Sequence, residues 1–114
     1  MTKKRIYEIY RFLAVASMKR LTDEEKFALI RLLRQMKPAS KELGEAINDA
    51  VQQAMTDGVA NIDEFVSKAV ADIENEETDI DVRIMTADAF QRLALSNDWN
   101  FGQIDELQEI MVKE

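Results

Sequence analysis

Apolar residues recur at helical spacing through most of the chain. The first amphipathic stretch covers about residues 3–20 and carries two neighbouring apolar stripes. A second stretch covers about 22–37, and Thr22 and Glu25 at its start have the spacing of a capping box. We expect Pro38 to end this helix, because its ring restricts the preceding residue and removes a backbone donor. The pattern predicts an N-terminal antiparallel helical hairpin.

Two further amphipathic helices are predicted between residues 39 and 77. Ser40 can cap the first of them, and Gly58 is the residue most able to adopt the left-handed conformation that ends it. Asn61 and Glu64 repeat the capping pattern in front of the second helix.

The hydrophobic period changes from helical to two at residues 78–85. Ile80, Val82 and Ile84 alternate there with charged residues, which indicates one short extended segment. A lone strand has no ladder partner in its own chain. The segment therefore either packs as an extended arm or pairs with its copy in a second subunit.

A short helical pair completes the chain. Thr86 caps its first helix, a turn that contains Trp99 follows, and the second helix begins at about Phe101. The fold class is all-α, with five to six helices and the extended segment before the last helical pair. We expect a single domain over 1–114, made of a basic hairpin (1–38), two amphipathic helices (39–77) and the segment with its helical pair (78–114).

Charge is divided unevenly along the chain. Residues 1–41 hold eleven basic and four acidic side chains, a net charge of +7, whereas residues 42–114 have a net charge of −14. Blocks of opposite sign suggest self-association, pairing of the two halves or two surfaces with different partners. The basic side chains that would form one surface are Lys3, Lys4, Arg5, Arg11, Lys19, Arg20, Arg31 and Arg34.

Nucleic acid ranks below protein as a partner of this basic surface, because no aromatic or glycine-rich pattern accompanies it. A helix-turn-helix over 90–111 is disfavoured, since the helix that would read DNA is acidic. The first helix could lie on an anionic membrane surface, but packing against the second helix explains its apolar side better. No apolar stretch is long enough to span a membrane, and we expect a cytoplasmic protein.

The chain contains no cysteine and no histidine. Disulfides, thiolate metal sites, cysteine nucleophiles and the commonest general base are therefore excluded. The acidic run over 74–81 lacks the glycine and the spacing of a calcium loop, and the stretch 57–65 has the wrong register for one. We expect no catalytic residues, no metal site, no cofactor and no enzymatic activity.

Three stretches, KFALIRLLRQMKP, NEETDIDVRI and IDELQEIM, follow one another along the chain. Together they resemble small phage and prophage proteins that are grouped as a domain of unknown function. The resemblance spans most of the chain. It implies a phage or prophage origin and a noncatalytic accessory or assembly role, and it transfers no functional residues.

The sequence thus predicts a protein-binding or assembly module that self-associates through its helical faces and residues 78–85. Its candidate interaction residues are Ile80, Val82, Ile84 and Trp99. An acidic regulatory or inhibitory protein that targets a basic host partner is the alternative. Nucleic-acid binding through the basic hairpin ranks lower.

Overall fold

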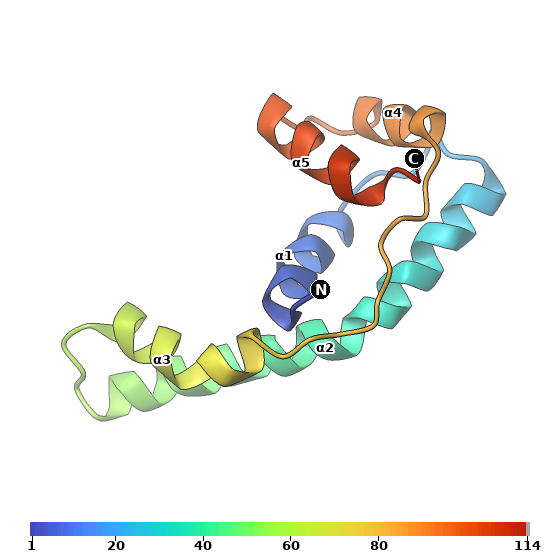
Figure 1. Ribbon diagram of the computed structural model, residues 1–114. Coiled ribbons are helices and arrows are strands. Elements are labelled where there is room, and N and C mark those ends of the chain that lie inside the picture. The colour runs from blue at the N-terminus through green and yellow to red at the C-terminus, as the bar shows by residue number, and fades with distance from the viewer. Residues whose placement is uncertain (114) are drawn as a thin grey trace. The chain divides into compact units, whose positions relative to one another are not determined.

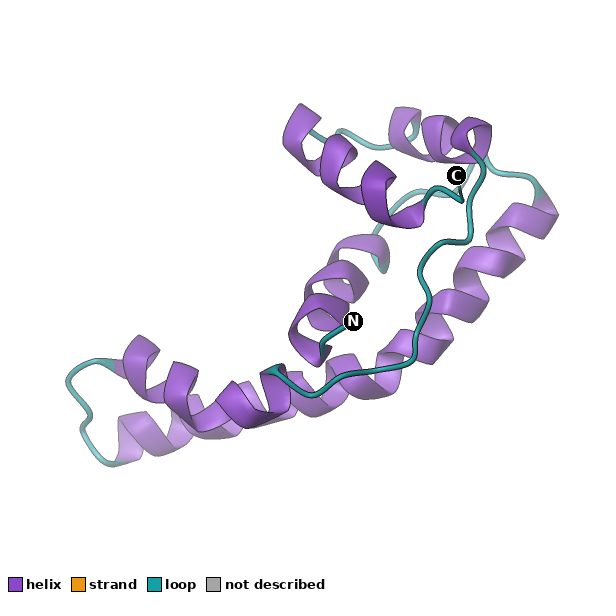
Figure 2. Ribbon diagram, in the orientation of Figure 1, coloured by secondary structure: helices purple, strands orange, loops and turns teal. Residues whose placement is uncertain are grey.

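The computed structural model describes residues 1–113, and this range contains five helices and no strand (Figures 1 and 2). The predicted all-α class is confirmed. The helices are α1 (Lys3–Leu13), α2 (Asp23–Thr56), α3 (Ile62–Glu74), α4 (Ala87–Leu95) and α5 (Phe101–Met111).

The prediction that Pro38 ends a helix is wrong, because α2 continues through it as one ribbon of 34 residues (Figure 1). The prediction that Ser40 caps a separate helix is wrong for the same reason, and Ser40 is buried inside α2. Pro38 lies on the exposed side of α2, where water can bond to the Arg34 carbonyl that loses its donor. The buried stripe keeps its helical period across the proline, through Leu29, Leu32, Met36, Ala39 and Leu43.

The first helix is shorter than the predicted 3–20, since α1 ends at Leu13. The Asn97 side chain holds the following segment out of the helix. It accepts a hydrogen bond from the Ser17 N–H (2.8 Å) and donates to the Ser17 carbonyl (3.0 Å). These bonds replace the backbone partners that Ser17 would have in a helix, so a residue 80 positions away ends the first helical stretch.

The predicted start of the second helix is confirmed. Thr22 and Glu25 form the reciprocal capping box: the Thr22 N–H donates to the Glu25 carboxylate (2.8 Å), and the Glu25 N–H donates to the Thr22 hydroxyl (3.2 Å). The N-terminal helices α1 and α2 pack together as predicted. Tyr7 of α1 lies against Gly44 of α2.

The other predicted helix boundaries are also confirmed. Asn61 caps α3 and Thr86 caps α4 through their side-chain oxygens. Gly58 has a φ of +67°, and the Val59 N–H donates to the Ala54 carbonyl at 2.9 Å. This is the Schellman arrangement that ends a helix, and it places α3 alongside the last part of α2 (Figure 1).

The chain forms two compact units, each built from separated segments. The first comprises residues 1–12 and 36–79. The single domain over 1–114 stays a prediction. Leu43, Ala50 and Val70 form its buried cluster, and aromatic and aliphatic side chains of α1, α2 and α3 pack around them. The second unit comprises residues 13–35 and 80 onward, with Leu93 and Met111 completely buried.

Candidate functional site

The extended segment at 78–85 is bonded to its own chain near each end. In the first unit, the Thr78 N–H and hydroxyl both donate to the Met1 carbonyl, at 2.8 and 2.9 Å. In the second unit, the Met85 N–H donates to the Met111 carbonyl (3.1 Å) and the Met85 carbonyl accepts from the Lys113 N–H (2.9 Å). Isolated bridges accompany these bonds at Thr2–Glu77 and Met85–Val112. The segment thus finds backbone partners in its own chain.

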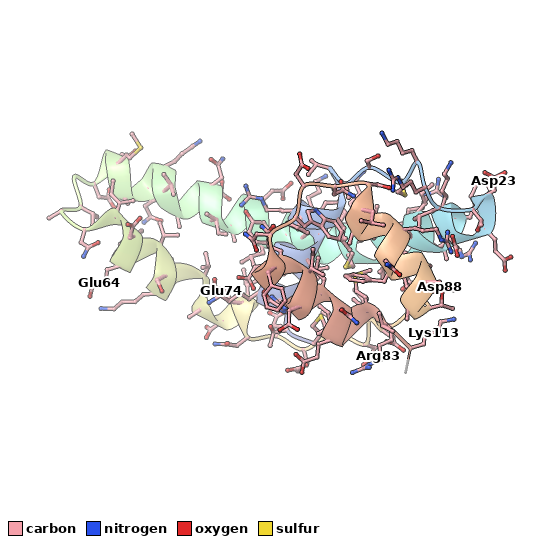
Figure 3. The ribbon with its side chains drawn as sticks, turned by 90° about the horizontal axis from the view of Figure 1, so that it is seen from above. Asp23, Glu64, Glu74, Arg83, Asp88 and Lys113 are labelled. Carbon is pink, nitrogen blue, oxygen red and sulfur yellow. The ribbon has the colours of Figure 1, made fainter. Side chains whose placement is uncertain are left out.

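Burial along this segment follows the predicted alternation. Val82 is buried, Ile80 and Ile84 are half-buried, and Asp81 and Arg83 are exposed. Arg83 reaches back to donate to the Val112 carbonyl at 3.3 Å, and Figure 3 shows it at the same edge as Lys113. The three aliphatic side chains proposed for association therefore pack largely into their own chain, and Val82 does so completely.

Trp99, the fourth predicted interaction residue, lies in the turn between α4 and α5. It is half-buried, and its ring centroid is 6.3 Å from that of Phe90, with the rings tilted by 41°. Such a tilted pair stabilises the turn. Next to it, Asn100 and Gln103 form a second reciprocal capping box at the start of α5.

Two of the exposed large hydrophobic side chains of the second unit lie on α4 and α5. Leu95 and Phe101 are 60% and 83% exposed. A hollow of about 330 Å³ opens beside Leu95, and its walls are mainly apolar. We call this hollow the α4–α5 groove; it is lined by Ala87, Phe90, Gln91, Ala94, Leu95, Ile104 and Gln108.

Acidic side chains flank the α4–α5 groove. Asp88 lies one residue after Ala87, Asp105 follows Ile104, and Glu109 follows Gln108. All three carboxylates are exposed, and Asp88 projects from α4 in Figure 3. Residues 86–113 contain five acidic and two basic side chains, so the surroundings of the groove are negative.

One of those two cations is held by a remote carboxylate. Arg92 of α4 binds Glu25 of α2 with two parallel contacts, Nη1 to Oε1 at 2.6 Å and Nη2 to Oε2 at 2.8 Å. The Arg92 guanidinium, followed by the Thr22 backbone N–H, lowers the pKa of Glu25 to about 2. This bidentate pair fixes the position of α4 against the beginning of α2.

A second hollow, of about 510 Å³, lies beside this ion pair. Its walls carry charges of both signs, with Glu24 and Glu25 on one part and Arg31 and Lys113 on another. A hollow with opposed charges does not point to one class of ligand, and we assign it no role.

Comparison with protein-family models, with curated proteins and with solved structures gives no match. The functional assignment therefore depends on the geometry of the chain itself.

The predicted basic surface is divided between the two units. In the first unit, Lys3 lies between two carboxylates, Glu42 at 2.8 Å and Glu76 at 2.5 Å. Hydrogen bonds to these two groups raise the pKa of Lys3. Arg11 lies over the Tyr7 ring, 5.2 Å from its centroid. Lys3 and Arg11 are thus engaged within their own unit.

The remaining predicted basic residues differ in their exposure. Arg5 lies 3.8 Å from Glu8, while Lys4 is exposed on the same helix. In the second unit, the exposed members are Lys19, Arg20, Arg31 and Arg34. Arg31 and Arg34 follow Phe27 on one side of α2, and Phe27 is itself 61% exposed.

Two other kinds of site are absent from residues 1–113. No helix in this range is both long enough and apolar enough to cross a membrane. Within the same range, no group of three or more acidic side chains is placed to hold a metal ion.

The sequence reasoning did not identify Leu95, Phe101 or the groove beside them. One signal was present: α4 carries apolar residues on more faces than its burial uses, with Ala87, Ala94 and Leu95 outside its core stripe. A helix that is apolar on two sides has a second surface to cover.

Proposed function

We propose that this chain is a protein-interaction module that binds a helix of its partner in the α4–α5 groove. The observation that carries the proposal is the exposure of Leu95 on the wall of a mainly apolar hollow, with Phe101 exposed one helical turn before the wall residue Ile104. Exposed apolar surface next to a concavity is typical of protein-binding sites. An amphipathic helix places apolar side chains at the spacing that such a groove can receive.

The structure of the α4–α5 hairpin supports this proposal, because the groove is held in shape before any partner arrives. Thr86 and Asn100 cap the two helices, and Leu93 and Met111 anchor them in the core of the unit. The Glu25–Arg92 ion pair fixes α4 from the other side. A preorganised surface loses less conformational entropy on binding, so a small groove can still bind with useful affinity.

The charge around the groove indicates the chemistry of the partner. Asp88, Asp105 and Glu109 are exposed, and each follows a lining residue of the groove along α4 or α5. A helix with an apolar face and flanking Lys or Arg side chains would complement both features. We therefore propose binding rather than catalysis as the function, with a cationic amphipathic helix as the ligand.

A display library of amphipathic helices tests this proposal on the full-length chain. We expect selection to enrich helices with basic flanks, and we expect the groove variant Leu95→Ser/Phe101→Ser to bind them at least about thirtyfold more weakly, as for a hot-spot pair. Met55→Ser is the matched control, since Met55 is 66% exposed but lies on the other unit. Selected helices that bind the groove variant and the wild type equally would refute the proposal.

A further inference from the structure

We propose that the helix bound in the α4–α5 groove is the first part of α2 from a second copy of this chain, with Phe27 as the inserted side chain. This inference rests on the function proposed above and names its partner. The contact joins two different surfaces of the same molecule. Copies would therefore associate head to tail.

The α2 surface around Phe27 is apolar at one point and basic beyond it. Phe27 is 61% exposed, and Arg31 and Arg34 follow it four and seven residues later on the same side of the helix. These positions place the two arginines about 6 and 10 Å further along the helix axis. The surface thus presents an aromatic side chain followed by two cations. This is the chemistry proposed above for a ligand of the α4–α5 groove.

The receiving side of the contact carries the opposite charge. Asp105 and Glu109 are exposed one helical turn apart on α5, next to the groove residues Ile104 and Gln108. With Phe27 in the groove, the arginines of one copy can lie along the carboxylates of the other. The hollow of about 330 Å³ has apolar walls that can receive an aromatic ring.

Within its own unit, Phe27 points away from the helix that carries part of the groove. On α2, Phe27 lies roughly 200° around the helix from Glu25, which faces α4. On α4, the groove residue Leu95 lies on the same side as Arg92, one turn further along. Phe27 is therefore directed away from the groove of its own chain, and its exposed ring remains accessible to a neighbouring copy.

This geometry has a consequence for the assembly. An interface between unlike patches leaves one unused patch of each kind at the two ends, so association continues into open chains or closes into a ring. A contact of one aromatic side chain and two ion pairs is small, which places it among weak, reversible interfaces. The average mass should therefore rise steadily with protein concentration.

Sedimentation velocity over a wide concentration range, at low salt, tests the proposal. For wild type we expect an average mass that passes beyond the dimer. We expect Phe27→Ser alone, and Leu95→Ser/Phe101→Ser alone, to weaken association at least about thirtyfold, while Met55→Ser leaves it unchanged. Circular dichroism should show that all variants keep the helical content of wild type.

Mixing the two defective proteins gives the decisive measurement. The groove variant retains Phe27 and the Phe27→Ser variant retains the groove, so one intact contact can form between them. We expect a 1:1 complex that does not grow further. An equal mixture that stays monomeric while wild type associates, or a Phe27→Ser variant that associates like wild type, would overturn the head-to-tail contact.

The two proposals fail in different ways. A wild-type chain that stays monomeric at every concentration would refute the second copy as the partner. The helix library would still enrich groove binders in that case if the proposed function is correct. If no helix from the library binds in a way that depends on the groove, the proposed function is instead refuted.

Discussion

Two helical hairpins in this chain are built from similar parts but present different surfaces. The α2–α3 hairpin comprises the part of α2 after Met36 together with α3, and its apolar cluster is covered. Among the described residues of this hairpin, Met55 is the one large hydrophobic side chain that is exposed. From residue 45 to 74 it carries seven acidic side chains and one basic. The α4–α5 hairpin exposes Leu95 and Phe101 beside a hollow.

Capping signals locate helices but do not show which of their surfaces binds a partner. Asn61, Thr86 and Asn100 each cap a helix in the same way. The hairpins differ in what covers their second apolar side. In the α2–α3 hairpin, Tyr7 packs against the cluster, whereas part of the α4–α5 hairpin remains uncovered.

The largest expected effect is the difference in the free energy of unfolding between truncating a core leucine and truncating a surface leucine of α4. Leu93 is completely buried and Leu95 is 60% exposed. We expect Leu93→Ala to lower the free energy of unfolding by about 2–5 kcal/mol. We expect Leu95→Ala to change it by less than about 0.5 kcal/mol. Urea unfolding measures both, and equal losses would show that Leu95 belongs to the core rather than to a binding surface.

A smaller effect, of opposite sign in the two hairpins, is expected at their glycines. Gly58 has a φ of +67°, so Gly58→Ala should cost about 1 kcal/mol although no atom lies within 4 Å of the added Cβ. Gly102 lies in the first turn of α5, and the Cβ added by Gly102→Ala would lie 3.4 Å from the capping Asn100 Oδ1, so this substitution should stabilise by at most about 0.5 kcal/mol. Thermal melts of the two variants measure the difference. Two shifts of the same sign would contradict this contrast.

The smallest expected effect concerns pH and the ion pair that holds α4. The folded-state pKa of Glu25, about 2, lies below its ordinary value of 4.5. The pair therefore stabilises the fold above about pH 4.5, and this contribution is lost as the pH falls towards 2. Glu25→Gln should lower the melting temperature at pH 7.

The difference between the melting temperatures of wild type and Glu25→Gln should shrink between pH 5 and pH 2. Glu64→Gln is the control from the other hairpin, because Glu64 forms an exposed ion pair with Lys68 one turn away and also accepts a hydrogen bond from the Asn61 side chain at 3.4 Å. A constant difference for Glu25→Gln across this pH range would mean that its carboxylate charge does not stabilise the fold.

Local signals made most helix boundaries predictable. Thr22, Asn61 and Thr86 bond to amides three residues ahead, so their roles can be derived from short stretches of sequence. The all-α class follows from the same periodicity. The rule that proline ends a helix failed at Pro38, because a continuous buried stripe outweighs one lost backbone bond.

The candidate site was less predictable because it depends on contacts between distant residues. The alternation at 78–85 correctly indicated an extended segment, but it could not show that Val82 is buried by its own chain. The exposure of Leu95 likewise depends on which side of α4 the rest of the unit covers. No local pattern in a single sequence shows which side of α4 the rest of the unit covers.

The bonds between Asn97 and Ser17 bear on the order in which the chain folds. They join residues 80 positions apart, and the entropy of closing so long a loop must be lost before the contact contributes. The turn at Gly58 closes a short hairpin and can form early. We therefore expect the end of α1 to be fixed late in folding, after α4 has formed. Until then, we expect residues 14–20 to extend the first helix, as their own sequence favours.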